Sequence, residues 1–141
     1  MSVRIRALKV SDYDDVVALW KRGGMKHEPR LRDSRKGIAR QIRMNPGLFL
    51  AAFEGKKMIG VLLTTYDGRR SWLNRACVDP ICRRKGIAKG LIVEAERRLR
   101  RKGVNLFAAL VEEGNVASLT LCESMGYIPR RDIVYMRKKE D

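Results

Sequence analysis

The chain has 141 residues, 45% of them hydrophobic, and this composition fits one globular domain and excludes an intrinsically disordered chain. Its 31 Lys and Arg residues against 16 acidic ones give a formal net charge of +15, which favours polyanions such as nucleic acid, acidic membranes or phosphate-bearing cofactors. Three cysteines and one histidine, His27, show no metal-ligand spacing, so we expect no metal centre. The sequence shows no signal-peptide pattern and no apolar stretch long enough to cross a bilayer, which predicts a cytoplasmic protein with no membrane partner.

Hydrophobic periodicity predicts the elements of the first half of the chain. Alternating apolar residues over 3–8 predict a half-buried first strand. Ser11 is expected to cap a helix that ends at Gly23 and Gly24, and a very basic second helix is expected over about 34–43. Three further strands follow, the first two as a hairpin, and they are predicted over 48–54, 58–66 and 71–78.

The second half of the chain alternates between helices and strands. A helix is predicted over 86–102 because its apolar residues recur on one face, and Gly103 is placed to end it. The continuous apolar run over 104–111 predicts a strand buried on both faces. A shorter helix over 116–125 and a final strand over 133–136 complete the chain. The resulting order, βααβββαβαβ, predicts a layered α/β or α+β domain with one central sheet.

A basic segment with a glycine lies between the fourth predicted strand and the helix that follows it. Its sequence is Arg83-Arg84-Lys85-Gly86-Ile87-Ala88-Lys89. The N–H groups of a first helical turn have no intrahelical acceptor and carry the positive end of the helix dipole. Gly86 has no Cβ, so a phosphate can approach the backbone closely. The segment is therefore predicted to be an anion-binding cradle suited to a pyrophosphate, and it lacks the spacing of a dinucleotide fingerprint or a P-loop.

Two motifs resemble the GNAT superfamily of acyl-CoA N-acyltransferases. Cys77-Val78-Asp79-Pro80 followed by Arg83-x-x-Gly86-x-Ala88 resembles the family's pyrophosphate-binding motif. The segment from Asn115 to Tyr127 resembles the family's Asn-x-x-Ala-x-x-Leu-Tyr-Glu-x-x-Gly-Phe segment, with Ser118 in place of the alanine. The resemblance implies one GNAT-type domain over residues 1–141. It also implies a single mixed, mostly antiparallel central sheet with helices on both faces and with splayed fourth and fifth strands.

The resemblance further implies an acetyl-CoA-dependent N-acetyltransferase in which a primary amine attacks the thioester directly. The backbone of Ala76, Cys77 and Val78 would bind the pantetheine arm and orient the acetyl carbonyl, and Asn115 would contact the arm from the start of a helix. The pyrophosphate would be held by Arg83, Arg84, Lys85, Gly86, Ile87, Ala88 and Lys89. The acceptor would be a small-molecule or protein amine, and a homodimer is compatible with the family.

Position 122 departs from the family pattern. The family's usual acid is a tyrosine seven residues after the asparagine, on the same helical face, and this chain has Cys122 there. Three interpretations remain open. The thiol donates a proton to the leaving sulfur through a water, or no acid is needed because a thiolate is already a fair leaving group, or the protein binds CoA with little turnover.

No motif marks the general base. We take Tyr66 and Glu28 as catalytic candidates beside Cys122, because Tyr66 ends the third strand and Glu28 lies in the loop that would border the amine. Other candidates are His27, Asp67, Glu112 and Glu113. Asn74 and Arg75 lie on the fourth strand, where the family often has its base, and neither is a good base at neutral pH.

Two functions of other classes compete with the enzyme. A nucleic-acid-binding module would contact phosphates through basic runs such as 35–36, 97–98 and 100–102. Few aromatic residues are interleaved with these runs and no nucleic-acid-binding motif is present, so the charge permits such a partner but we do not expect one. A catalytically weak CoA-binding protein would bind CoA without transferring the acetyl group.

Overall fold

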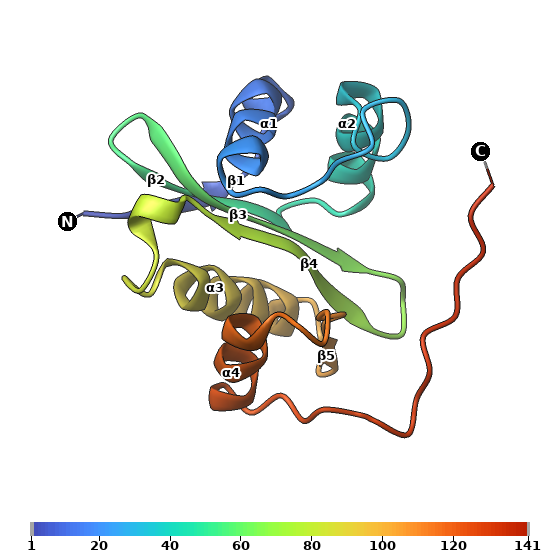
Figure 1. Cartoon of the computed structure of the whole chain (residues 1–141). Coiled ribbons are helices and arrows are strands. Elements are labelled where there is room, and N and C mark those ends of the chain that lie inside the picture. Colours follow the sequence, from blue (N-terminus) through green and yellow to red (C-terminus); the bar gives the residue numbers. More distant parts are fainter. Residues whose placement is uncertain (1, 141) are drawn as a thin grey trace. The chain divides into compact units, whose positions relative to one another are not determined.

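The computed structural model describes residues 2–140, which form two compact units, one up to residue 110 and one from residue 111 on. The first unit is built on a five-stranded sheet whose strands lie side by side in chain order (Figure 1). The strands are β1 (Arg4–Ala7), β2 (Phe49–Glu54), β3 (Lys57–Tyr66), β4 (Ser71–Val78) and β5 (Phe107–Ala108). The strands from β1 to β4 pair antiparallel and β5 pairs parallel with β4, which confirms the predicted mixed, mostly antiparallel sheet.

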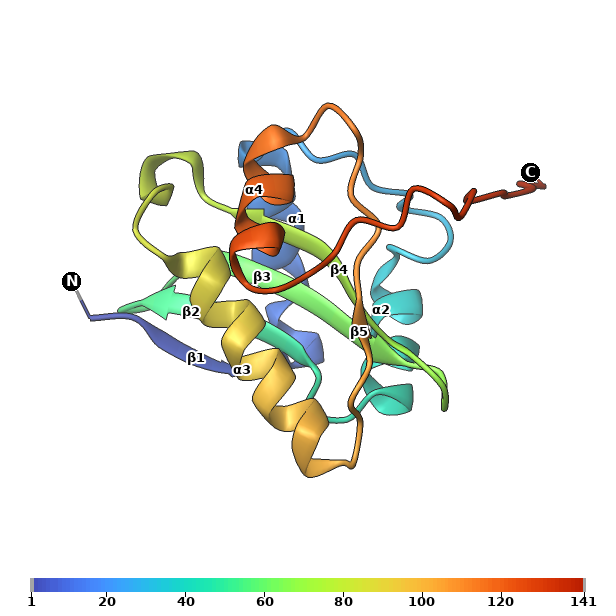
Figure 2. The same ribbon diagram turned by 90° about the horizontal axis from the view of Figure 1, so that it is seen from below.

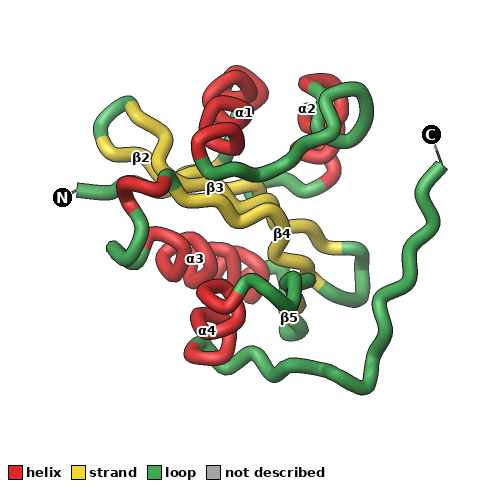
Figure 3. The backbone as a smooth tube through the Cα atoms, viewed as in Figure 1, coloured by secondary structure: helices red, strands yellow, loops and turns green. Residues whose placement is uncertain are grey.

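Helices cover both faces of this sheet, as predicted. One face carries α1 (Tyr13–Arg22) and α2 (Arg35–Met44), and the other carries α3 (Ile87–Arg101) (Figure 3). The turned view shows α3 lying across the strands (Figure 2). The predicted apolar stripe of α3 is buried, and it consists of Ile87, Leu91, Ile92, Ala95 and Leu99. On the opposite face, the core centres on Trp20, Leu19 and Phe49, all of which are at most 1% exposed.

Gly60 allows α3 to pack closely against β3. A Cβ at this position would lie 2.8 Å from Ile87 Cγ2 and 3.1 Å from Leu91 Cδ1. Both distances are shorter than ordinary contacts between carbon atoms, so the helix would have to move away from the strand. Gly60 therefore fixes the position of the first turns of α3.

We expect the substitution Gly60→Ala to lower the free energy of unfolding by about 1 to 2 kcal/mol, because overpacking a close-packed core forces neighbouring groups to shift. Gly90→Ala is the matched control. Gly90 lies in α3, and a Cβ there would meet only Ile5 Cδ1, at 3.5 Å. Its replacement should stabilise the protein by up to about 1 kcal/mol, the helix-propensity difference. Urea unfolding of both variants measures the two effects, and equal midpoints would contradict this account of Gly60.

The strands β4 and β5 separate soon after they meet. They pair only at Ser71 with Phe107 and at Trp72 with Ala108, whereas β4 continues to Val78. This is the predicted splay of the fourth and fifth strands. On its other edge β4 pairs with β3, and the register shifts beyond Asn74. Arg75, at this irregularity, has a φ of 57°, which is unusual for a residue with a side chain.

Three sequence expectations need correction. The apolar run 104–111 forms only the two-residue strand β5, and it is not buried on both faces, because Leu106 and Leu110 are 46% and 55% exposed. The run loses its hydrogen-bond partner where β4 diverges from it, so the β4–β5 pairing ends after Ala108. The expected strand 133–136 has no regular secondary structure. A strand needs a neighbour, and within residues 111–140 the only regular element is a helix.

The start of the first helix also differs. A 3-10 turn over Val10–Asp12 contains Ser11, and α1 begins at Tyr13 after Asp12. The Asp12 carboxylate accepts a hydrogen bond from the Lys9 N–H at 2.8 Å and two from Arg6, at 2.8 and 3.0 Å. These contacts hold the turn ahead of α1 without a serine cap.

The second unit contains α4 (Val116–Ser124). Asn115 caps the helix, since its side-chain oxygen accepts a hydrogen bond from the Ser118 N–H at 3.2 Å. Gly126, with a φ of 93°, follows the end of the helix. Across residues 2–140, none of the helices combines the length and apolar character that crossing a membrane requires.

Candidate functional site

The loop between β4 and α3 begins with a tightly held turn. Val78 ends β4, and the Asp79 N–H then donates to the Ile59 carbonyl at 2.8 Å, which extends the contact with β3. Pro80–Cys82 form a 3-10 turn, and α3 begins at Ile87. A strand is thus connected through a short loop to a helix that points its N-terminus at the end of the sheet.

Asp79 organises this turn through a buried carboxylate. Its Oδ1 accepts a hydrogen bond from the Ile81 N–H at 3.2 Å, and its Oδ2 lies 2.9 Å from Arg22 Nε and 3.8 Å from Lys57 Nζ. Arg22 also donates to the Met58 carbonyl at 3.1 Å. Burial disfavours the charged carboxylate, but the hydrogen bonds and the two cations outweigh it and hold the pKa of Asp79 below its ordinary value.

The predicted anion cradle contains two left-handed backbone positions. Arg84 and Gly86 have φ values of 65° and 76°, and left-handed residues of this kind occur in the anion-binding backbone turns called nests. The first i to i−4 hydrogen bond of α3 runs from the Gly90 N–H to the Gly86 carbonyl, so the N–H groups of the preceding turn have no intrahelical acceptor. A Cβ on Gly86 would meet no atom within 4 Å, which leaves open space above the backbone.

Side chains around the cradle combine one buried anchor with several free cations. Ile87 is 5% exposed and packs into the core, which fixes the first turn of α3. Four cationic side chains surround the cradle: Arg83, Arg84, Lys85 and Lys89. All four are exposed, and none forms an ion pair with an acidic residue among residues 2–140. The arrangement therefore offers backbone donors and uncompensated positive charge to a phosphate group.

The segment Ala76–Val78 presents its backbone at the open edge of β4. Pairing with β5 ends at Trp72, so backbone groups beyond that point are available on this edge. The Cys77 side chain points the other way, into the core, where its Sγ lies 3.7 Å from the Leu19 carbonyl. Burial raises the pKa of the Cys77 thiol, although neighbouring arginines partly oppose this. Its side chain is therefore structural, and only its backbone could bind a ligand.

Cys77 packs against Gly23 at the end of α1, where a Cβ would lie 2.6 Å from Cys77 Sγ. Gly23 has a φ of −81°, so an alanine adds a steric clash without backbone strain. We expect Gly23→Ala to lower the free energy of unfolding by about 1 to 2 kcal/mol, and Cys77→Ala in the same chain to restore part of that loss. Denaturant unfolding of the two single variants and the double variant measures the coupling, and strict additivity would exclude the contact.

The loop between α1 and α2 lies against the irregular part of β4. Arg75 donates from Nη2 to the Lys26 carbonyl at 2.6 Å, and the same nitrogen lies 3.7 Å from the Asp33 carboxylate. The guanidinium also stacks on the Trp20 ring at 4.5 Å. Asp33 in turn accepts a hydrogen bond from the Glu28 N–H at 2.7 Å. Arg75 and Asp33 thus hold the residues around Glu28 close to the open part of β4.

The structure separates the two predicted base candidates. Glu28 is connected to β4 through Asp33 and Arg75, as described above. Tyr66 pairs with Ser71, at the opposite end of β4 from Val78. Seven residues of β4 separate Ser71 from Val78, which corresponds to roughly 20 Å. Tyr66 is therefore not brought together with Ala76–Val78, and Glu28 is the better placed of the two.

Asn115 and Cys122 lie in the second unit, on α4. The Asn115 oxygen is used in capping the helix, and its amide NH2 group remains as a donor. Cys122 is half-buried, and burial raises the pKa of its thiol, so the group is protonated at neutral pH. A protonated thiol is the form that an acid role requires.

Comparisons with known proteins agree with this geometry. The family model described as "Acetyltransferase (GNAT) family" matches residues 13–127. An acetyltransferase of Photorhabdus laumondii is 31% identical over 128 residues, which cover 91% of this chain and 88% of the relative. An acetyltransferase of Pectobacterium atrosepticum is 30% identical over 125 residues, which cover 89% of this chain and 87% of that protein.

Solved structures have the same fold. The PaiA N-acetyltransferase of Thermoplasma acidophilum, in complex with coenzyme A, has a TM-score of 0.79 at 22% identity and covers 89% of each chain. AAC(6')-Iy, in complex with a CoA-containing bisubstrate analogue, has a TM-score of 0.80 at 19% identity and covers 99% of each chain. The fold, the two motifs and the family match together show that the chain belongs to the GNAT family of acetyltransferases, whose co-substrate is acetyl-CoA.

Proposed function

We propose that the protein transfers the acetyl group of acetyl-CoA to the nitrogen of a primary amine. The observation that carries the proposal is the continuity between the open edge of β4 at Ala76–Val78 and the cradle that precedes α3. Backbone groups at such an edge can hold an extended arm, and the cradle can hold the pyrophosphate at its end. We further propose that the two units serve as one catalytic domain, because the family match extends across both.

The cradle residues fit a pyrophosphate. The N–H groups from Arg84 to Lys89 donate to the phosphate oxygens, and the open space above Gly86 admits them. The cationic side chains of the cradle neutralise the charge of the phosphates. The motif resemblance assigns Asn115 to the pantetheine arm, where its free amide group would donate a hydrogen bond.

The chemistry requires three groups around the thioester. The amine nitrogen attacks the thioester carbon, so that a C–N bond forms and the C–S bond breaks. A backbone N–H of Ala76–Val78 donates to the oxygen that becomes negatively charged. Glu28 accepts the proton that the amine loses, directly or through a water, because the contacts of Asp33 and Arg75 hold it beside β4. The sulfur leaves as a thiolate that is protonated by Cys122.

Cys122→Ala is expected to lower kcat by about 10-fold, near the lower limit for a general acid, because a thiolate already leaves readily. Acetyl-CoA affinity should stay unchanged. The protonated thiol is the active form and burial raises its pKa, so loss of the acid should lower wild-type kcat at alkaline pH, above the ordinary thiol value of about 8.5, whereas a fall in acid would reflect protonation of the base. The alanine variant should lack this alkaline limb. A pH profile of kcat for both proteins tests the assignment, and identical profiles would show that no acid acts from position 122.

The proposed function is tested first by thermal unfolding with saturating acetyl-CoA. ATP at matched ionic strength is the control, because a chain of charge +15 attracts any polyanion. A ligand at about 100 times its dissociation constant stabilises the folded state by ~2.7 kcal/mol, or roughly 5 to 10 °C here. A larger shift with acetyl-CoA than with ATP, followed by acetylation of an amine in a mass-spectrometric screen, supports the proposal. Equal shifts would refute the cofactor site, and a shift without any acetylated amine would favour a CoA-binding protein.

A further inference from the structure

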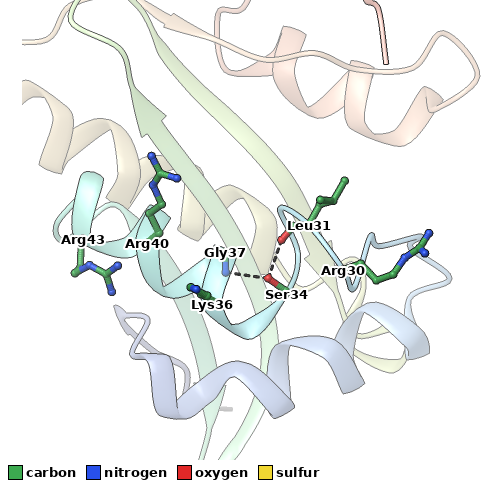
Figure 4. Close-up of a pocket in the computed structure, with 7 residues that line it drawn as sticks. All are labelled: Arg30, Leu31, Ser34, Lys36, Gly37, Arg40 and Arg43. Atoms are coloured by element: carbon green, nitrogen blue, oxygen red, sulfur yellow. Dashed lines mark hydrogen bonds between the residues drawn. The ribbon is translucent and has the colours of Figure 1, made fainter. Parts of the chain in front are cut away.

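A cationic pocket lies beside α2, away from the cradle. It has a volume of about 280 Å3. Its walls come from the end of the α1–α2 loop and from one side of the helix (Figure 4). It is lined by Arg30, Leu31, Ser34, Lys36, Gly37, Arg40 and Arg43. We call this surface the α2 groove. Among its residues, Arg30 contacts the carboxylate of Glu28, and the others have no part in the acetyl transfer described above.

Three cations of the α2 groove lie on one face of the helix. Lys36, Arg40 and Arg43 are spaced i, i+4 and i+7, which places them in one line along α2. Ile38 is 1% exposed and anchors the opposite face in the core, and the partly buried Ile42 packs beside it. Because the apolar residues fix the inner face, the three cations are held toward solvent.

These cations have no acidic partner. Within residues 2–140, Lys36, Arg40 and Arg43 form no ion pair. The Arg30 guanidinium has a long ion-pair contact of 3.9 Å with the Glu28 carboxylate, which also accepts a hydrogen bond from the Arg30 backbone N–H at 3.3 Å. The arginines of α3 differ, since three of them are paired with acidic residues of the same helix: Arg97 and Arg98 with Glu94, and Arg100 with Glu96. The α2 groove therefore concentrates uncompensated positive charge, whereas much of the charge of α3 is neutralised.

The shape of the groove is fixed by close packing of the loop against α2. The Gly37 N–H donates to Ser34 Oγ at 2.9 Å, and Ser34 Oγ donates to the Leu31 carbonyl at 2.7 Å (Figure 4). A Cβ on Gly37 would lie 2.5 Å from the Leu31 carbonyl oxygen and 3.0 Å from that of Arg32. A glycine at this position, which would ordinarily weaken a helix, therefore permits the loop to form one wall of the groove.

We infer that the α2 groove binds the phosphate backbone of a nucleic-acid duplex. From Lys36 to Arg43 the helix rises about 10 Å, which matches about three phosphates of one strand at ~3.4 Å per phosphate along the duplex axis. Arginine guanidinium groups suit phosphate oxygens because their planar donors bind two oxygens at once. The lining residues include no aromatic side chain on which an unpaired base could stack, so the contact is with the backbone of a duplex.

The alternative anionic partners fit less well. A membrane surface requires a continuous apolar face on the bound side of a helix. Ile38 and Ile42 of α2 face the core instead, and the exposed apolar side chains beside the cations are isolated ones, Leu31 in the groove and Met44 at the end of α2. An acidic peptide would carry fewer charges per unit length than a duplex, which has one per ~1.7 Å. The inference adds to the proposed acetyl transfer and does not depend on it.

The test measures binding of a fluorescent DNA duplex of about 16 base pairs by anisotropy over a range of salt concentrations. The groove variant is Lys36→Gln, Arg40→Gln and Arg43→Gln combined. The matched control is Arg69→Gln, Arg101→Gln and Lys102→Gln combined, which removes the same charges from exposed positions elsewhere. Each triple variant has a net charge of +12, since three positive charges are removed from +15. Thermal unfolding confirms that both variants fold.

We expect the groove variant to bind the duplex 10- to 100-fold more weakly than wild type at about 100 mM salt, with a salt-dependence slope reduced by about 3. The control should lose less than about 3-fold. Equal losses in both variants, or no loss in the groove variant, would overturn the inference in favour of diffuse charge. Equally tight binding of poly-glutamate or of phosphatidylserine vesicles would overturn it in favour of those partners. Displacement of the duplex by acetyl-CoA would show that the duplex binds at the cradle instead. If acetyl-CoA raises the unfolding temperature of the groove variant as much as that of wild type, the two sites are separate.

Discussion

Gly86→Ala should weaken acetyl-CoA binding by about 100-fold while the protein remains folded. A Cβ at this position would occupy the open space above the cradle, so that the phosphates could no longer lie against the N–H groups. Losing about two hydrogen bonds to a charged group at the lower limit of ~1.5 kcal/mol each corresponds to a loss of this size. Isothermal titration calorimetry with acetyl-CoA measures the effect.

The same substitution also strains the backbone, because Gly86 has a φ of 76°. An alanine in this conformation costs about 1 to 2 kcal/mol of stability. Gly103→Ala separates the two effects, since Gly103 has a φ of 82°, no neighbouring atom within 4 Å of a Cβ, and a position after the opposite end of α3. Gly103→Ala should lower the free energy of unfolding by a similar amount and bind acetyl-CoA with wild-type affinity. If both variants lost affinity alike, the cradle would not be the phosphate site.

Asp79→Ala should lower the free energy of unfolding by about 2 to 3 kcal/mol. It removes the cap of the 3-10 turn and leaves Arg22 without its buried partner. We place the loss below the largest values for buried pairs because the Arg22 side chain is 38% exposed and can be hydrated. Asp14→Ala is the matched control, since Asp14 pairs with Arg35 at 2.8 Å but is 83% exposed, and surface pairs contribute less than about 1 kcal/mol.

The contribution of Asp79 should also depend on pH. Its folded-state pKa lies below the ordinary value, so the stabilisation is fully present above the unfolded-state pKa of about 3.9 and is lost as the pH falls through the folded-state pKa. The difference in unfolding free energy between wild type and Asp79→Asn should therefore be constant near neutral pH and shrink in acid. Urea unfolding between about pH 7 and pH 3 measures it. A difference that grows in acid would contradict the assigned ion pair.

The parts of the site that the sequence predicted are local in the chain. The cradle lies within seven consecutive residues between a strand and a helix, so periodicity and the glycine position were enough to locate it. The packing of α3 was predictable for the same reason, because its apolar residues repeat every three or four positions. The family resemblance then supplied the splay of β4 and β5, which pairing limited to Ser71 and Trp72 confirms.

The parts that were not predicted depend on contacts between distant segments. Arg22 lies 57 residues before Asp79, and nothing in either neighbourhood marks them as partners. Arg75 contacts the Lys26 carbonyl 49 residues away, so its clamp on the α1–α2 loop was equally hidden. The run 104–111 was misjudged because apolar character cannot show where the neighbouring strand diverges. The basic residues of the segment 30–43 likewise gave no indication that four of them, Arg30, Lys36, Arg40 and Arg43, line one pocket.

The backbone of Arg75 has a consequence for engineering this protein. A residue with a side chain at a φ of 57° stores about 1 to 3 kcal/mol of strain, and here it does so beside the strand edge proposed to hold the acetyl group. Glycine or asparagine at this position would relieve the strain, since both tolerate that conformation, but either would lose the guanidinium contacts with Lys26, Asp33 and Trp20. One substitution there would remove both the strain and the contacts that hold the loop carrying Glu28, so backbone strain and the position of the proposed base are linked at a single residue.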